Sequence, residues 1–266
     1  MTVITALSDG AVVAKRNLLK ITRLPDLLVF STVQPIMFVL LFAYVFGSAI
    51  DVPGVSYTDY LMGGIFVQTV VFGATITGAG LADDIKKGII DRFRSLPMAR
   101  SAVLVGRTTS DLLNNALVVA IMAVTGLIVG WGIHTSFWEA AGGFAILLMF
   151  SYAISWMMAT VGLSVSSVEV VQNASFLVIF PLTFISNAFV PITNFPPVLK
   201  TFAEWNPVSA VAQAVRELFG NTSPLFPPPD VWPLQNAVLA SSIWIVIFLV
   251  VFVPLAVSRF KKSAAR

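Results

Sequence analysis

Long apolar runs separated by short polar segments are the dominant pattern of this chain. A membrane-spanning helix needs about 20 mostly apolar residues. Six stretches meet that length: 27–50, 60–82, 112–133, 140–165, 170–190 and 237–257. These runs are continuous, whereas the strands of a membrane β-barrel alternate apolar and polar residues. The pattern therefore predicts an all-α integral membrane protein, with six transmembrane helices in a single domain over residues 1–266.

The composition agrees with this prediction. The chain is 57% hydrophobic and only 11% charged, whereas soluble domains carry about 25% charged residues. A soluble fold of this length would have too few charges for its surface. The absence of cysteine excludes disulfides and thiolate metal ligands. The first 20 residues show no compact apolar core followed by a small-residue cleavage site, so we expect no cleavable signal peptide.

The distribution of basic residues predicts the orientation. Of the 16 Lys and Arg residues, only Lys200 and Arg216 lie outside the N-terminal segment, the 83–107 region and the C-terminus. Cytoplasmic loops are enriched in Lys and Arg, so we expect both termini in the cytoplasm and a location in the inner (plasma) membrane. The net charge of +3 then reflects topology and attraction to anionic headgroups, and we expect no nucleic-acid partner.

Two segments outside the spans are predicted to be helical. Residues 11–24 mix apolar and basic positions before Pro25, which is typical of an interfacial helix on the inner leaflet; a plain basic tail is the alternative. Residues 193–222 are too short and too polar to span twice, and Pro196, Pro197 and Pro207 divide them. We expect an outer re-entrant helical segment there, acting as a gate or lid, with an interfacial anchor helix as the alternative.

The loop over residues 83–100 is a charged island between two apolar spans. On a helix from Asp84 to Leu96, the residues Ile85, Ile89, Phe93 and Leu96 share one face. Asp83 and Asp84 would cap its start, and Pro97 would end it. This pattern predicts an amphipathic helix that lies either on the membrane or in a partner's groove, and helical spacing alone leaves both possibilities open.

Two motifs resemble those of ABC type-2 transporter permeases, in particular the daunorubicin-resistance type of drug and lipid exporters. The first is KKGIIDRFRSLPMARSAVLVGRTTSDLLNN, residues 86–115, which carries the LP-x-(S/A)R and GR-x-x-(A/S)D patterns. The second is ISNAFVPITNFPPVLKTFAEWNPVSAVAQAVRELFGN, residues 185–221, which is similar to the outer segment between the last two spans. The resemblance covers essentially the whole chain.

The resemblance implies that the charged loop contains a coupling helix, which in this family sits in a cleft of the ATPase subunit. Ile89 and Phe93 would fill the cleft, and the neighbouring charges would set the register. Many members have Glu where this chain has Asp91. The implied ATPase-coupling residues are Ile85, Gly88, Ile89, Asp91, Arg92, Phe93, Arg94, Leu96, Pro97 and Arg100.

The chain contains no G-x-x-x-x-G-K-(S/T) sequence, the loop that cradles nucleotide phosphates. We therefore expect a transporter membrane subunit that is not itself an enzyme. The resemblance places ATP and Mg on a partner ABC ATPase, expected in two copies, beside a second permease copy or a sister permease. The expected function is export of hydrophobic or amphipathic compounds, drugs or lipids, out of the cytoplasm. Export of a polysaccharide or glycolipid, a non-transporting membrane scaffold and a membrane-embedded acyltransferase are the alternatives.

Polar residues within the spans suggest a pathway. No span carries a central charge, which argues against coupling to protons or sodium. In the family, spans two and five line the path, and interhelical packing is the alternative role for such residues. The candidate pathway residues are Gln68, Thr75, Asn173, Phe176, Phe180, Thr183 and Asn187. His134 is the sole histidine, and we expect neither a metal site nor a catalytic site. Gly126 and Gly130 suggest a close helix contact.

Overall fold

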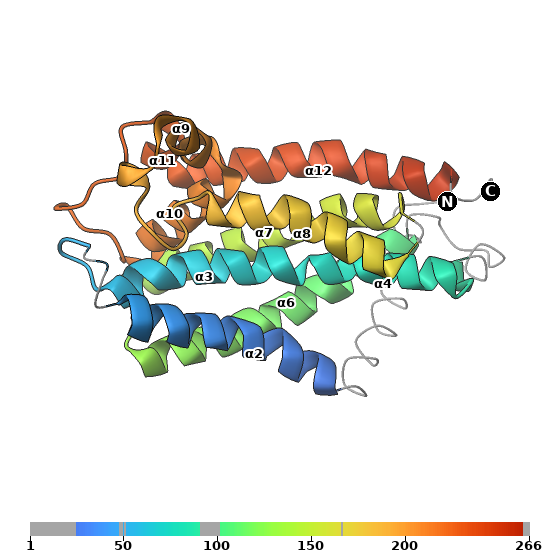
Figure 1. The fold of residues 1–266 in the computed structure, drawn as a ribbon, viewed down its shortest axis with the longest axis horizontal. Coiled ribbons are helices and arrows are strands. Elements are labelled where there is room, and N and C mark those ends of the chain that lie inside the picture. The colour runs from blue at the N-terminus through green and yellow to red at the C-terminus, as the bar shows by residue number, and fades with distance from the viewer. Residues whose placement is uncertain (1–24, 48–49, 51, 91–101, 166, 263–266) are drawn as a thin grey trace.

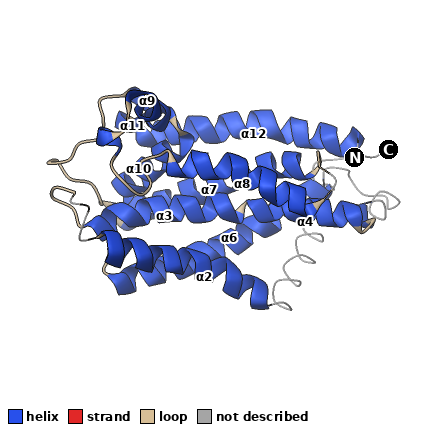
Figure 2. Cartoon of the chain, in the orientation of Figure 1, coloured by secondary structure: helices blue, strands red, loops and turns tan. Residues whose placement is uncertain are grey.

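The computed structural model describes residues 25–47, 50, 52–90, 102–165 and 167–262. These residues form an elongated helical bundle whose long helices run along the main axis (Figure 1). The described residues contain no β-strand (Figure 2), only an isolated bridge between Ser223 and Phe226. The elements are α2 (Pro25–Leu41), the π-helix η1 (Phe42–Phe46), α3 (Tyr57–Gly73), α4 (Thr75–Lys86), α6 (Ala102–Val129), α7 (Phe137–Gly162), α8 (Val168–Phe184), the 3₁₀ turn η2 (Ile192–Asn194), α9 (Pro197–Trp205), α10 (Pro207–Phe219), α11 (Trp232–Gln235) and α12 (Ala237–Lys262).

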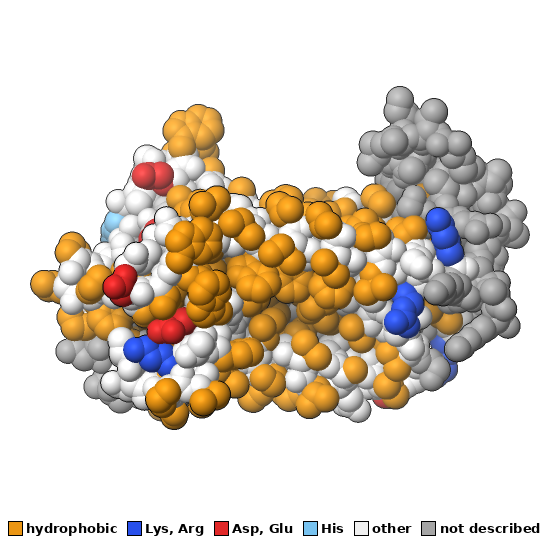
Figure 3. Space-filling view, turned by 90° about the horizontal axis from the view of Figure 1, so that it is seen from above, with side chains coloured by type: hydrophobic (Ala, Val, Ile, Leu, Met, Phe, Trp, Pro, Cys, Tyr) orange, Lys and Arg blue, Asp and Glu red, His pale blue; other side chains and the backbone are white. Residues whose placement is uncertain are grey.

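Four helical stretches within the described residues are long and apolar enough to cross a membrane: Tyr57–Lys86, Ala102–Val129, Phe137–Gly162 and Ala237–Lys261. Two shorter apolar helices, Thr32–Val45 and Val168–Phe184, lie where the sequence predicts two further spans. Apolar side chains cover the middle of the face in Figure 3, and charged side chains gather at its two ends. This division is typical of a bundle with a hydrophobic belt and two polar ends.

Helix α7 lies at the centre of the bundle. It contacts α3, α4, α6, α8, α10 and α12, and side chains such as Leu147, Phe150 and Ile154 are fully buried. Its first turn is fixed by a capping box. The Ser136 hydroxyl accepts from the Glu139 amide, and the Glu139 carboxylate accepts from the Ser136 amide. These bonds satisfy main-chain donors that a helix start otherwise leaves free.

Small residues set how closely α4 and α7 approach each other. A Cβ atom on Gly78 would lie 2.7 Å from the carbonyl oxygen of Met158, and one on Gly162 would overlap the carbonyl oxygen of Gly78. Two backbones can come this close only without side chains between them.

The predicted close helix contact in span three has a different form. A Cβ atom on Gly126 would meet the side chains of Met62 and Trp131, so this glycine makes room for side chains of its neighbours. Gly130 follows the end of α6 with φ +99°, and a Cβ atom there would meet nothing within 4 Å. Gly126 therefore serves packing, whereas Gly130 serves the turn that ends the helix.

The second predicted span is divided into two helices. The break falls at Ala74, between Gly73 and Thr75, and the Thr75 hydroxyl donates to the carbonyl oxygen of Phe72 at 2.7 Å. A side-chain hydroxyl that competes for a main-chain carbonyl in this way weakens the regular helical ladder. Span two is therefore a jointed element, with α3 leading to one end of the bundle and α4 to the other.

The charged loop departs from the predicted continuous helix. Helix α4 runs on to Lys86, and the chain turns at Lys87 and Gly88, where Gly88 has φ +66°. This left-handed conformation suits glycine because it has no Cβ. Asp83 and Ile85 therefore belong to the end of the second span, and they do not share a helix with Ile89. The helix resumes at residues 89–90.

Of the two other predicted helical segments, one can be compared with the structure. The 11–24 segment lies outside the described residues, as do residues 91–100 of the charged loop. Over residues 193–222 the chain forms two short helices, α9 and α10, which meet at Asn206. Proline stands at the first position of each helix, where its missing amide hydrogen costs nothing.

Candidate functional site

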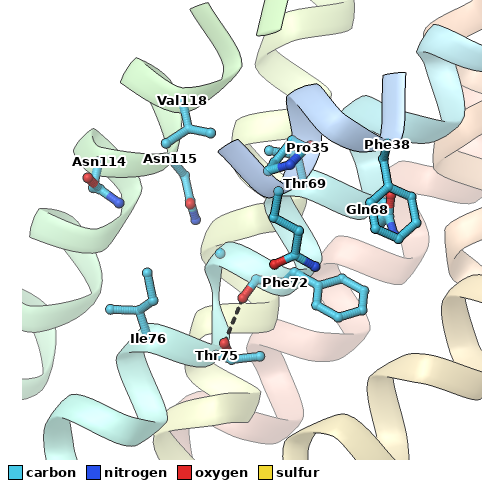
Figure 4. A pocket seen from close by; sticks show the side chains of 12 residues that line it. Pro35, Phe38, Gln68, Thr69, Phe72, Thr75, Ile76, Asn114, Asn115 and Val118 are labelled. Atoms are coloured by element: carbon cyan, nitrogen blue, oxygen red, sulfur yellow. Dashed lines mark hydrogen bonds between the residues drawn. The ribbon is translucent and has the colours of Figure 1, made fainter. Parts of the chain in front are cut away.

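A cavity of about 180 Å³ lies within the helix bundle. Figure 4 shows its walls: α2 contributes one side, α6 a second, and α3 with the start of α4 a third. The break between α3 and α4 lies in this wall, since both Gly73 and Thr75 line it. The lining residues are Gln34, Pro35, Phe38, Gln68, Thr69, Phe72, Gly73, Thr75, Ile76, Asn114, Asn115 and Val118.

The lining combines amide and hydroxyl groups with aromatic rings, and it carries no ionisable side chain. Gln68 and Thr69 are buried, and the Thr69 hydroxyl has no hydrogen-bond partner within the described residues. Phe38 and Phe72 supply apolar surface (Figure 4). Pockets for small molecules commonly pair apolar walls with a few placed polar groups. This lining suits an uncharged ligand, or the uncharged part of an amphipathic one.

The wall formed by α6 is held in place by Asn115. Its amide nitrogen donates to the Ser151 hydroxyl of α7 at 2.7 Å, and its side chain is buried. A Cβ atom on Gly73 would overlap the Asn115 amide oxygen. Asn115 is therefore fitted tightly against the joint in span two, and a change at this joint would alter the cavity wall.

A buried ion pair lies next to the cavity, on the side toward the charged loop. Arg107 Nε donates to Asp111 Oδ2 at 2.9 Å, and the Thr77 hydroxyl donates to the same oxygen at 2.7 Å. Arg107 Nη2 also donates to the carbonyl oxygen of Ile76 at 2.9 Å. Since Thr77 and Ile76 belong to α4, these bonds tie the start of α6 to the start of α4. The two helices that flank the charged loop are thus joined beside the cavity.

The predicted pathway residues do not form one surface. Gln68 and Thr75 line the cavity together. Of the candidates on α8, Asn173 is exposed, Phe176 packs edge-on against the cavity residue Phe72 with ring centroids 6.5 Å apart, and Phe180 stacks on Phe176 with ring centroids 5.0 Å apart. The cavity is therefore lined by α2, α6 and the second span, and α8 adjoins it through the contact of Phe176 with Phe72. The role of the α8 residues in a pathway stays a prediction.

The last two candidate pathway residues, Thr183 and Asn187, are buried and make hydrogen bonds within the bundle. The Thr183 hydroxyl donates to the carbonyl oxygen of Ile179 within α8. Asn187 follows α8, and its main-chain oxygen accepts from the Tyr60 hydroxyl at 2.8 Å. Asn187 lines a second, smaller pocket at the end of the bundle where α9 and α10 lie. The helical spacing that groups these residues by face does not reveal which neighbour covers that face.

Only the first coupling candidates lie within the described residues. Ile85 ends the second span, Gly88 forms the turn and Ile89 begins the next helical segment. The remaining candidates, from Asp91 to Arg100, lie outside the described residues. Asp83 and Lys87 form an exposed ion pair at 2.7 Å, and the hydrogen bond from Lys87 to Asp83 raises the pKa of the Lys87 ammonium group.

Arg216 is a buried residue that the sequence reasoning treats as an ordinary outer-loop charge. Its side chain is 1% exposed, and its guanidinium lies 3.7 Å from the centre of the Tyr60 ring. It donates to the main-chain oxygens of Tyr60, Asn187 and Ala188 at 2.7, 2.8 and 3.0 Å. The sequence signal is modest: a lone basic residue within a strongly apolar helical stretch.

The second motif forms one packed unit around this arginine. Asn206, at the start of α10, accepts from the Val208 amide and donates to the carbonyl oxygens of Leu182 and Ile185 at 2.7 and 2.8 Å. The main-chain N–H of Asn187 in turn donates to the Ser209 hydroxyl at 3.0 Å. The two ends of the motif, around Asn187 and Asn206, therefore hold the end of α8 against α10.

The fold and this cavity define a multi-pass helical membrane protein with an uncharged polar site inside its bundle. Comparison with known proteins identifies the family: residues 10–219 match the model for the ABC-2 type transporter. The chain belongs to this family, whose members are transport permeases. A transport permease subunit is not itself an enzyme.

Three curated relatives are also named as transport permeases. The daunorubicin resistance ABC transporter permease protein DrrB1 of Streptomyces coeruleorubidus is 33% identical over 219 residues, covering 82% of this chain and 77% of the relative. The putative transport permease ycf38 of Pyropia yezoensis is 25% identical over 214 residues, 78% of this chain and 72% of the relative. The probable doxorubicin resistance ABC transporter permease protein DrrC of Mycobacterium tuberculosis is 24% identical over 191 residues, 69% of this chain and 67% of the relative.

Proposed function

We propose that this chain is the membrane subunit of an ATP-binding-cassette exporter that moves hydrophobic or amphipathic compounds, drugs or lipids, out of the cytoplasm. All six apolar helices would cross the plasma membrane, with both termini in the cytoplasm. Two copies of a separate ABC ATPase, carrying ATP and Mg, would drive transport. A second permease copy or a sister permease would complete the pathway.

The observation that carries this proposal is the uncharged cavity in a chain of this family. Its amides and hydroxyls come from α2, α3, α4 and α6, and aromatic rings stand among them. Such walls suit planar or amphipathic molecules. Two of the relatives are named as daunorubicin and doxorubicin resistance permeases, which supports a drug-like substrate.

The buried ion pair supports a route from the charged loop to the cavity. The loop over residues 87–101 connects α4 to α6, and Arg107 and Asp111 join these two helices at Ile76 and Thr77. Ile76 itself lines the cavity. When an ATPase displaces the loop, α4 and α6 would move as a linked pair, and the joint at Ala74 would absorb the change in angle.

Substitutions in the loop test the coupling step. The double variant Ile89→Ala and Phe93→Ala, co-expressed with a partner ABC ATPase, should lose the stable complex and vanadate-sensitive efflux. Lys200→Ala in α9, at the opposite end of the bundle, is the control and should retain both. Normal ATPase binding and transport by the double variant would refute the coupling role.

A second pair of variants tests the cavity. Gln68→Leu removes a buried amide from the cavity wall, whereas Gln172→Leu makes the same chemical change at an exposed position of α8. The proposal predicts that Gln68→Leu alters the ranking of transported substrates while ATPase binding is kept. Gln172→Leu should transport like the wild type. Identical substrate profiles for all three proteins would show that the cavity does not contact substrate.

A further inference from the structure

Arg216 carries a buried positive charge that the protein only partly compensates. A guanidinium has five N–H donors, and the three hydrogen bonds to main-chain oxygens occupy Nε and Nη2. Nη1 is buried and has no hydrogen-bond partner within the described residues. Among the residues that the structure describes, no carboxylate lies in ion-pair range of Arg216, since every ion pair found there joins other residues. Burying a charge without a counter-ion is costly.

The neighbouring acid, Glu217, forms no ion pair with Arg216 in the structure. Glu217 accepts a hydrogen bond from the Gln213 amide at 3.1 Å. Burial raises the pKa of the Glu217 carboxyl, because desolvation disfavours its charged form. The positive charge of Arg216 is therefore available to a group from outside the chain.

A small pocket lies beside the arginine. It has a volume of about 30 Å³, and the residues that line it include Arg216, Asn187, Thr193, Thr222 and Ser223. The side-chain oxygen of Asn187 is buried and has no partner among the described residues, and the amide can turn its NH₂ group toward the same ligand. A volume of this size holds roughly one or two water molecules, or the tip of one anionic group.

The level of the pocket indicates where the anion comes from. Trp205 and Trp232 are exposed, at 55% and 49%, on α9 and α11, at the same end of the bundle (Figure 1). Trp138, in the first turn of α7, is 81% exposed. Exposed tryptophans gather at the membrane–water interface, at the depth of the lipid headgroups. We propose that the pocket at Arg216 binds the phosphate group of a membrane phospholipid.

The site would fix a lipid at the junction of α3, α8 and α10. One phosphate oxygen would enter the pocket and accept from Nη1 of Arg216 and from the Asn187 side-chain amide, and the rest of the phosphate would lie outside the pocket. A bound phosphate would then complete the hydrogen bonding of the arginine that clamps the second motif. This inference requires only that the chain is a membrane protein, so it stands or falls separately from the proposed export function.

The test uses Asn187→Leu, because Arg216 also holds three main-chain oxygens and its substitution can unfold the protein. The Asn187 side chain makes no hydrogen bond among the described residues, so leucine fills the pocket and leaves the main-chain bonds in place. Asn194→Leu makes the same change at an exposed position nearby that does not line the pocket. The readout is the thermal midpoint of the detergent-purified full chain, titrated with phosphatidylglycerol, with diacylglycerol of the same acyl chains, or with inorganic phosphate.

We expect phosphatidylglycerol to raise the midpoint of the wild type and of Asn194→Leu, with diacylglycerol giving a smaller shift. In Asn187→Leu the apparent affinity for phosphatidylglycerol should fall roughly tenfold or more, as expected for the loss of charge-assisted hydrogen bonds. Equal titrations for Asn187→Leu and Asn194→Leu, or equal shifts with diacylglycerol, would overturn the site. A shift with inorganic phosphate and none with phosphatidylglycerol would overturn the lipid assignment.

Discussion

The buried pair of Arg107 and Asp111 makes a quantitative prediction. Their side chains are 11% and 7% exposed, and Asp111 also accepts the Thr77 hydroxyl. Asp111→Ala leaves the Arg107 guanidinium buried without its counter-ion. Removing one partner of a buried pair costs about 3–5 kcal/mol. For a chain of this size that corresponds to a midpoint lower by roughly 6–20 °C.

The double variant Arg107→Met with Asp111→Leu separates charge burial from packing. Replacing both members of a buried pair by apolar residues is often close to neutral, so the double variant should be more stable than Asp111→Ala. The assay is thermal unfolding of the purified protein in detergent, followed by tryptophan fluorescence. Asp83→Ala is the matched control, since Asp83 pairs with Lys87 four residues away at an exposed site.

The control should leave the midpoint within measurement error, because exposed ion pairs contribute little. The reasoning would be refuted if Asp111→Ala lowered the midpoint no more than Asp83→Ala. It would also be refuted if the double variant were less stable than Asp111→Ala, because the uncompensated charge would then not be the cause. The same variants report on coupling: Asp111→Ala should reduce transport more than it reduces ATPase binding.

Three further predictions concern the backbone. Gly162→Ala should lower the thermal midpoint, because its Cβ would overlap the α4 main chain. Gly142→Ala in the same helix should be neutral or stabilising, since the nearest neighbour of its Cβ is a leucine side chain at 3.9 Å. Equal thermal midpoints for the two variants would contradict this prediction. Ser136→Ala should cost about 1 kcal/mol through loss of the α7 cap, measured by denaturant unfolding, and Ser136→Thr should restore most of it. Gly88→Val should weaken ATPase binding more than Gly88→Asn, because Gly88 has φ +66° and Asn tolerates that conformation better; a pull-down with equal recovery of both variants would argue against a required turn.

The sequence predicts the helical content and the apolar segments well, because a hydrophobic run of this length can satisfy its main-chain hydrogen bonds in a membrane only as a helix or in a closed barrel. It does not predict the joint at Ala74 or the turn at Gly88. Both breaks depend on single residues. Neither residue changes the apolar or amphipathic pattern of the segment around it. The continuous helix predicted from Asp84 through Ile89 is wrong for this reason: the turn at Gly88 separates Ile85 from Ile89.

The candidate site shows the same division. Gln68 and Thr75 are correctly grouped, since seven residues place them on one side of the second span, even with the joint between them. The pathway role predicted for α8 stays a prediction; helical periodicity gives the face of a helix and not its neighbour, so it does not reveal that Phe176 packs against Phe72 beside the cavity. Asn115 and Arg216 are missed because their importance comes from burial by residues distant in sequence, Ser151 and Tyr60.

Reconstituted transport is the decisive test of whether this chain is an exporter subunit. The chain and its partner ATPase would be placed together in liposomes, with a fluorescent amphipathic drug as substrate. We expect ATP-dependent, vanadate-sensitive drug movement that requires both proteins, and a changed drug preference for Gln68→Leu but not for Gln172→Leu. Drug movement that does not depend on ATP or on the ATPase, or its absence with a correctly assembled complex across a panel of amphipathic drugs and lipids, would contradict it.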